Sequence, residues 1–337
     1  MCYDSSIYPK HGAIIAKRSC VQFVASKSER LDKFLTKELQ QPRNQVEQLI
    51  KQGFVQIDGK RAKKGGEKLK PGQRIEVELP KPSQSKAEPV DFEVERLYED
   101  EDILVLNKPA GVVVHPAPSV KEATLVDWLK QEGIRLSTLS GQERHGIVHR
   151  LDKETSGLMV VAKNNETHQA LANQLQDRTM GRYYLAIIEP PLKEDVVIEK
   201  PIARNPKNRL KMGIVEGGRY AKTLFKKLVL SKNEKYELIG AKLYTGRTHQ
   251  IRVHLASINR HILGDHLYGF KSQKVTIPRV FLHAYMLYLK HPKSGELLHF
   301  VAKVPQDMQA FLKKEFEMER VDEAIDADSF RNRFSSL

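Results

Sequence analysis

One short segment divides the chain into two separately folded regions. Residues 81–89 read KPSQSKAEP, a run rich in proline, serine and lysine without a large apolar side chain. This composition is typical of a linker, because it offers nothing to bury in a hydrophobic core. The changes of pattern along the chain predict five parts: a poorly ordered extension over 1–28, a small domain over 29–80, the linker over 81–90, a large domain over 91–305, and an amphipathic helix with a polar tail over 306–337.

Composition excludes several classes of protein. The 337 residues are 40% hydrophobic and 29% charged, which is typical of globular domains rather than of disordered or fibrous chains. The two cysteines, Cys2 and Cys20, exclude a disulfide framework and favour a reduced, cytoplasmic location. No apolar run is long enough for a membrane span. The net charge of +14 indicates an anionic partner, with RNA or DNA first.

The small domain is predicted to contain two helices followed by a small sheet. Apolar residues with helical spacing begin at Leu31, and Pro42 separates this helix from a second one that closes at Gly53. An Asp-Gly turn at 58–59 and an alternating strand over 75–79 follow. Lysines and arginines outnumber acids in this region, which on composition alone is also compatible with an ordinary solvated surface.

The order of these elements favours RNA binding over a merely solvated surface. RLDKFLTKEL, followed by PRNQVEQLIKQGFVQIDGKRAKKGGEKLKPGQRIEVELP, resembles the S4 RNA-binding domain over nearly its full length. The resemblance implies that the second helix and the loop after it meet RNA phosphates, and thereby assigns Arg43, Lys51, Arg61 and Lys63 to RNA binding. Many S4 domains have serine where this chain has Pro42, so the capping contact in the first turn of the second helix is left open.

The large domain is predicted to be an α+β domain with a mixed, mainly antiparallel sheet and flanking helices. Its strand-like runs are joined by short connections, which favour antiparallel pairing over repeated βαβ units. Helix-like stretches occur near 125–130 and 166–176. The predicted strands lie at 92–98, 103–107, 158–162, 183–188, 223–230, 236–243 and 281–289.

Two polar stretches of the large domain are the candidates for chemistry. GIVHRLDKETSGLMVVAKN, residues 146–164, and LYTGRTHQIRVHLA, residues 243–256, both carry polar side chains on a turn between apolar segments. Taken separately, they are equally compatible with Asp152 capping a turn and Arg252 forming a surface ion pair. The chain lacks the phosphate-loop and dinucleotide motifs, and the histidines are not spaced as metal ligands on a helix, so no metal or cofactor is expected.

Together, these stretches resemble the RluA/RluD family of RNA pseudouridine synthases. HRLDKETSG, a YYLA strand, TGRTHQIRVH, LGDHLYG and LHA occur in the family's order between about Phe92 and Pro305. The resemblance implies that Asp152 is the catalytic aspartate, that Arg252 is its cationic partner, and that Tyr184 packs on the uracil. A slip of one residue would exchange Tyr184 with Tyr183, because neighbouring residues of a strand face opposite sides.

The same resemblance suggests substrate-binding residues. Arg150 either occupies the space left by a flipped uridine or contacts a phosphate, and base flipping costs a few kcal/mol that such an insertion offsets. Arg247 is expected to face RNA, His249 to face RNA or to be structural, and Leu282 to line the pocket. Asp152 has three possible first steps: addition to uracil C6, addition to ribose C1′, or removal of the C2′ proton.

The resemblance implies an RNA pseudouridine synthase, an isomerase that needs no cofactor. The RluD-like features, VVVHPAP and the uninterrupted HRLDKETSG, favour a loop of 23S ribosomal RNA as the substrate, and tRNA is the alternative RNA. The competing class is a non-catalytic S4-bearing protein that binds RNA or the ribosome. We expect a monomer without an obligate protein partner.

Overall fold

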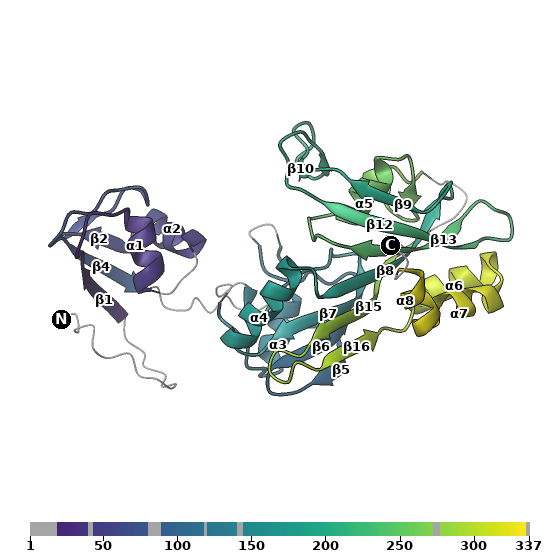
Figure 1. Ribbon diagram of the computed structural model, residues 1–337, viewed down its shortest axis with the longest axis horizontal. Helices are drawn as coiled ribbons and strands as arrows, with labels where there is room; N and C mark the ends of the chain where they lie inside the picture. Colours follow the sequence, from purple (N-terminus) through teal and green to yellow (C-terminus); the bar gives the residue numbers. More distant parts are fainter. Residues whose placement is uncertain are drawn as a thin grey trace. The chain divides into compact units, whose positions relative to one another are not determined.

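A computed structural model divides the chain into two compact units, with the boundary after Ala87 (Figure 1). The predicted extension up to residue 18, Pro42 and the predicted linker up to residue 88 lie outside the described residues. Among the residues that are described, no helix is both long and apolar enough to cross a membrane. The described residues are 19–39, 43–79, 89–117, 120–139, 144–271 and 277–334.

The N-terminal unit packs two helices, α1 (Leu31–Glu38) and α2 (Arg43–Gln52), against a four-stranded antiparallel sheet. Apolar side chains from both helices and from alternate strand positions form one separate core, as the sequence pattern predicts. The strand order is β1-β4-β2-β3, with bounds Ser19–Val24 (β1), Arg74–Leu79 (β4), Val55–Ile57 (β2) and Lys60–Arg61 (β3).

Strand β1 corrects the prediction that all of residues 1–28 form a poorly ordered extension. Val21 and Phe23 stand opposite Val77 and Ile75 of β4, and the Phe23 ring contacts Phe34 with 6.1 Å between centroids. The segment contains too few apolar residues to reveal a strand by itself. It becomes one because β4 presents an edge with which its backbone pairs.

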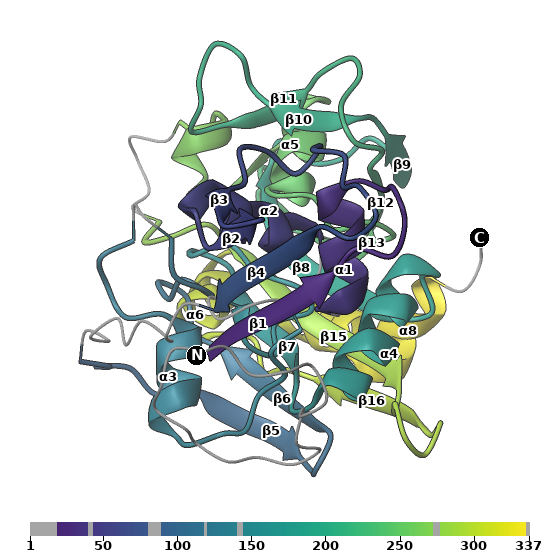
Figure 2. The same ribbon diagram turned by 90° about the vertical axis from the view of Figure 1, so that its left-hand side faces the viewer.

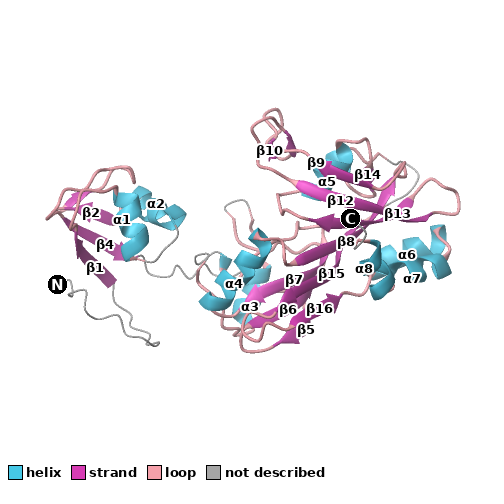
Figure 3. Cartoon of the chain, in the orientation of Figure 1, coloured by secondary structure: helices cyan, strands magenta, loops and turns pink. Residues whose placement is uncertain are grey.

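The large unit is built on a ten-stranded sheet, shown as arrows in Figure 3. All pairings are antiparallel except that of β7 with β15, which confirms the predicted mixed sheet. The strands in spatial order are β5 (Glu95–Glu99), β6 (Ile103–Lys108), β7 (Ser156–Ala162), β15 (Leu282–Lys290), β8 (Gly181–Glu189), β13 (Glu237–Leu243), β12 (Lys222–Leu230) and β9 (Val196–Glu199), with β14 (His261–Ile262) paired to β8 and β16 (Leu297–Val301) paired to β15.

The central strands are buried along almost their whole length because helices and loops cover both faces of the sheet. Every residue of β7 is buried, in line with its apolar sequence SGLMVVA. α3 (Leu125–Gln131) lies near β6, and α4 (Asn165–Gln176) contacts β7 (Figure 1). α5 (Gln250–Ala256) lies beside the hairpin of β10 (Ile202–Arg204) and β11 (Met212–Ile214) (Figure 2). The continuous core of this unit includes side chains from β8, β13 and the C-terminal helices.

The C-terminal segment differs from the predicted single helix with a polar tail. It forms three helices, α6 (Gln306–Glu315), α7 (Met318–Ile325) and α8 (Ala327–Arg333). Phe330 of the last helix and Phe334 directly after it are buried against Tyr183, with ring centroids 6.2 and 5.0 Å away. Two aromatic side chains in a polar sequence show too little periodicity to predict a helix, yet they complete the core of the sheet.

Candidate active site

The loop before β7 carries Asp152, and hydrogen bonds from the buried side chain of Lys108 hold this loop in place. Nζ of Lys108 donates to the carbonyl oxygens of Pro109 at 2.7 Å, Val112 at 2.9 Å and Lys153 at 3.3 Å. Burial lowers the pKa of Lys108 to about 7. The backbone N–H of Gly111 also donates to the Lys153 carbonyl, at 2.8 Å. Lys108 thus ties the turn at 109–112 to the residue that follows Asp152.

Arg252 joins Asp152 to a second carboxylate, Asp265. Nη1 of Arg252 donates to Oδ2 of Asp152 at 3.1 Å, while Nε and Nη2 donate to the two oxygens of Asp265 at 2.7 and 2.9 Å. Burial by itself would lower the pKa of Arg252, but the hydrogen bonds and charge of Asp265, followed by Asp152, raise it. The guanidinium is therefore a fixed, permanently charged neighbour of the Asp152 carboxylate.

Arg252 projects from helix α5, whereas the sequence predicted a turn around it. The side chain of Gln250 organises the start of this helix: its oxygen accepts from Thr245 Oγ1 at 2.8 Å and from the Arg247 N–H at 3.0 Å. His249 precedes the helix with a left-handed φ of 56°. These contacts place Arg247, His249 and Arg252 of one short segment around Asp152.

A pocket between the two polar stretches brings the predicted residues of the large domain together. Tyr184 lines it from β8 and Leu282 from β15, next to Asp152. Burial raises the pKa of Tyr184 to about 12, so its hydroxyl is protonated at neutral pH. Tyr183 faces the other side of the sheet and packs on Phe330. The pocket is lined by Arg150, Leu151, Asp152, Thr155, Tyr184, Leu243, Arg247, His249, Gln250, Ile251, Arg252 and Leu282.

The two histidines beside the pocket differ in environment. Nε2 of His149 accepts from the backbone N–H of Val160 at 3.1 Å, and burial lowers its pKa to about 3, so this histidine is a neutral structural group. Nδ1 of His249 lies 2.8 Å from the hydroxyl of Tyr268, and its Nε2 lies 3.8 Å from Oδ2 of Asp152. Burial also lowers the pKa of His249, although the charge of Asp152 opposes the shift.

The four predicted RNA-binding residues of the N-terminal unit fall into two groups. Lys51 and Lys63 are exposed and have no side-chain partner among the described residues. Arg43 instead donates to the buried carboxylate of Asp32 at 2.9 and 2.5 Å, and Arg61 donates to the Lys51 carbonyl at 3.1 Å. Both arginines thus help to hold their own domain together.

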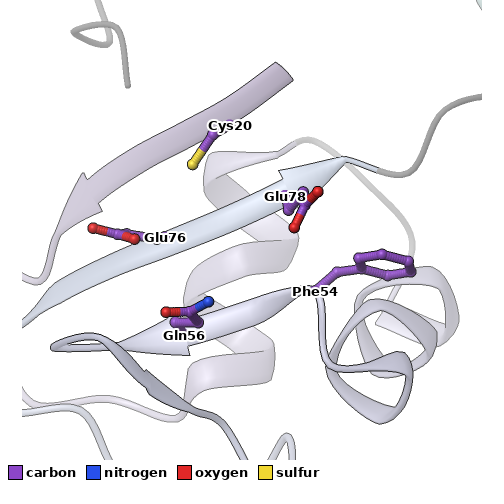
Figure 4. A pocket seen from close by; sticks show the side chains of 5 residues that line it. All are labelled: Cys20, Phe54, Gln56, Glu76 and Glu78. Atoms are coloured by element: carbon purple, nitrogen blue, oxygen red, sulfur yellow. The ribbon is translucent and has the colours of Figure 1, made fainter. Parts of the chain in front are cut away.

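The outer face of the N-terminal sheet has a pocket of its own, seen in Figure 4. Two carboxylates, Glu76 and Glu78, lie along its wall with Gln56, and Phe54 and Cys20 complete the lining. Negative side chains repel RNA phosphates. The exposed lysines of this unit are therefore the better candidates for RNA contact.

One group of potential metal ligands occurs among the described residues. Oxygen and nitrogen atoms of Asp100, Asp102 and His291 lie within 4.8 Å of one another. These side chains already have hydrogen-bond partners in the protein: Nε2 of His291 lies 2.9 Å from Oδ2 of Asp100, and Asn164 donates to Asp102 at 2.8 Å. None of these residues lines the pocket of Asp152.

Comparisons with known proteins identify the family. A profile described as RNA pseudouridylate synthase matches residues 102–257, and the S4 domain profile matches residues 29–75. An uncharacterized RNA pseudouridine synthase of Helicobacter pylori strain J99 is 51% identical over 316 residues, which cover 91% of this chain and 96% of the relative. The chain belongs to the RNA pseudouridine synthase family, whose members are isomerases that act on RNA.

Two further similarities extend this result. The ribosomal large subunit pseudouridine synthase D of Zymomonas mobilis is 39% identical over 280 residues, covering 80% of this chain and 88% of the relative. The structure of human RNA pseudouridylate synthase domain containing 1 has a TM-score of 0.55 and 24% identity, and covers 71% of this chain and 98% of that one. The second similarity supports the fold.

Proposed function

We propose that the chain converts uridine to pseudouridine in a loop of 23S ribosomal RNA, with Asp152 as the catalytic carboxylate. The observation that carries the proposal is the position of Asp152 in the pocket, 3.1 Å from a guanidinium that Asp265 holds in place. The relatives named ribosomal large subunit pseudouridine synthase D support the choice of RNA.

The reaction matches the groups that line the pocket. Isomerisation breaks the bond between uracil N1 and ribose C1′, forms a bond between C5 and C1′, and moves the proton of C5 to N1, so that no atom is gained or lost. A carboxylate next to the sugar can serve any of the three first steps considered above. The charge of Arg252 stabilises the negative charge of Asp152 while the carboxylate is shielded from water.

Tyr184 and Leu282 supply the surfaces that retain the base. Their side chains are 4% and 3% exposed and lie on neighbouring strands of the pocket wall. A detached uracil held between an aromatic and an aliphatic side chain can turn in place without escaping, which keeps the second bond-forming step intramolecular. Arg150 is exposed beside Asp152, a position that suits either insertion into the RNA or contact with a phosphate.

The test is to map the product. The full-length protein is incubated with 23S rRNA and with tRNA transcripts, and pseudouridine is located by reverse transcription after carbodiimide treatment. We expect product in 23S rRNA with wild type and none above background with Asp152→Asn. Asp195→Asn, which removes an exposed carboxylate, should retain wild-type activity.

Each other outcome has a definite meaning. Product in tRNA alone would replace the proposed substrate while keeping the reaction. Product formed by Asp152→Asn would contradict the role of Asp152. The absence of product in every RNA, together with intact RNA binding, would favour the non-catalytic binding protein.

A further inference from the structure

Arg182 is a buried cation that has no counter-charge among the described residues. It lies on β8 two residues before Tyr184, so both side chains project from the same face of the sheet. The residue is only 8% exposed, and within the described part of the chain its guanidinium has no hydrogen bond or ion pair. Burying an unpaired charge is costly, and burial lowers the pKa of Arg182.

The end of the Arg182 side chain lies at the turn that begins the second polar stretch. A Cβ atom on Gly246 would be only 2.7 Å from Nη1 of Arg182. Nε of Arg182 is fully buried, while the residue as a whole is 8% exposed. Because Gly246 is exposed, the guanidinium reaches the surface at a place where the chain has no side chain to cover it.

The next residue, Arg247, adds a second positive charge. Arg247 lines the pocket of Asp152, and its Nε donates to the Tyr220 carbonyl at 3.0 Å. Burial, followed by the charges of Arg219 and Arg182, lowers the pKa of Arg247, so Arg247 is close enough to both arginines to be affected by their charges. None of the three has an acidic partner in the described part of the chain.

We propose that Arg182 and Arg247 form a binding subsite for a phosphodiester of the RNA strand, next to the uridine that enters the pocket. Two guanidinium groups present paired N–H donors that match the oxygens of a phosphate. The phosphate supplies the missing counter-charge, and it fixes the backbone at the point where the target nucleotide leaves the strand. This inference rests on the proposed function, because the subsite serves the same pocket.

A phosphate explains the arrangement better than a packing role for Arg182. A methionine or leucine would fill the same space beside Tyr184 without the cost of a buried charge. A cation that is already ordered in the free protein loses little conformational entropy when the phosphate binds. The free energy spent on burying the charge of Arg182 is therefore recovered in the complex. The absence of a side chain at Gly246 gives the phosphate access to the guanidinium.

The test is a double-mutant cycle between protein and RNA. It uses the full-length chain in the Asp152→Asn background and the RNA hairpin in which wild type forms pseudouridine. The four phosphates nearest the target uridine are replaced one at a time by uncharged methylphosphonates, and dissociation constants are measured. At one of these positions, we expect the replacement to weaken binding by about tenfold with Arg182 present and less than about twofold with Arg182→Gln.

Further variants keep the test decisive if Arg182→Gln is poorly folded. Gly246→Ala should abolish the same coupling, because its Cβ displaces the guanidinium from an exposed turn without touching the core. Arg182→Lys should restore part of the affinity, since it keeps the charge but not the paired donors. Arg320→Gln, on an exposed position of α7, should retain the full coupling.

The outcomes separate this inference from the proposed function. If wild type modifies the RNA but the effects of Arg182→Gln and of every methylphosphonate on the dissociation constant are independent, the subsite is contradicted and the proposed function is not. A failure of wild type to modify any RNA would overturn the proposed function and the subsite with it. Full coupling in Gly246→Ala would also contradict the proposed path of the phosphate.

Discussion

Nη1 of Arg252 lies 3.1 Å from Oδ2 of Asp152, and it is the one nitrogen of that guanidinium that Asp265 does not engage. The Asp265 side chain is 2% exposed and that of Arg252 is 7% exposed. A buried bidentate pair of this kind fixes the plane of the guanidinium. The position of the positive charge next to Asp152 is therefore set by a residue that does not itself line the pocket.

Asp265→Asn should lower the rate of pseudouridine formation by about 100-fold, because a shift of the guanidinium by about 1 Å misplaces the charge beside Asp152. It should also reduce the free energy of unfolding by about 3 to 5 kcal/mol, since Arg252 loses a buried partner. Single-turnover kinetics and thermal unfolding measure the two effects. Asp195→Asn is the matched control, and a normal rate in Asp265→Asn would show that Arg252 needs no such support.

Lys108→Met should lower the single-turnover rate by about tenfold or more while leaving the affinity for RNA within about twofold. The reason is that Lys108 donates to the Lys153 carbonyl and so holds the loop of Asp152, yet it does not line the pocket. Lys303→Met, which changes an exposed lysine, should have no effect. Weaker binding at an unchanged rate would contradict this positioning role.

The sequence predicted the residues of the site better than the groups that support them. Asp152 and Arg252 lie in short polar stretches whose residue types point to chemistry, and the structure places them in contact. Lys108 and Arg182 carry no such local signal, and the motif LGDHLYG contributed to the family resemblance without assigning a role to Asp265. The importance of Lys108 and Asp265 comes from contacts with Lys153 and Arg252, which lie 45 and 13 residues away in the sequence, and only the fold reveals these contacts.

The fold shows the same division. Strands β7 and β8 could be predicted from their long apolar runs, which arise because each strand is buried on both faces. Strand β1 and helix α8 have weak patterns of apolar residues, so their sequences alone do not predict them. Strand β1 forms because it pairs with the edge of β4, and α8 forms because the aromatic side chain of Phe330 packs on the core at Tyr183.

Phe330→Ala should reduce the free energy of unfolding of the large domain by about 3 to 5 kcal/mol. The Phe330 side chain is fully buried, and its ring lies 5.2 Å from Tyr285 and 6.2 Å from Tyr183 between centroids. Denaturant unfolding followed by fluorescence measures the loss. Glu323→Ala, at an exposed position of α7, is the control. A loss below about 1 kcal/mol would indicate that α8 adds little to the core.

Changing Lys51 and Lys63 together to glutamine should weaken RNA binding and reduce the slope of log affinity against log salt by about 1 to 2. Both lysines are exposed and have no side-chain partner among the described residues, so their charges are available for phosphates. The thermal unfolding temperature should not change. Deleting residues 1–80 should flatten the slope further. An unchanged slope in both proteins would remove the N-terminal unit from RNA binding.

Asp32 links the stability of the N-terminal unit to pH. Its carboxylate is fully buried. Hydrogen bonds from Arg30 lower its pKa most, burial opposes this shift, and hydrogen bonds from Arg43 lower the pKa further, to about 2. A folded-state pKa below the unfolded value of about 4 means that the stabilisation is complete above pH 5 and is lost as the pH falls from about 4 to about 2. The two arginines are 45% and 54% exposed, so solvent screening limits the effect to about 1 to 2 kcal/mol.

Comparing wild type with Asp32→Asn as a function of pH tests this linkage. Hydrogen exchange of the α1 amides in the full-length protein reports the local stability. We expect the variant to exchange faster at pH 6, by about tenfold, and the difference to shrink as the pH is lowered toward 3. Arg43→Gln should lose part of the same stabilisation, because it removes one of the two ion pairs of Asp32. A difference that stays constant with pH would mean that Asp32 acts through packing, and that Arg43 is free to bind RNA.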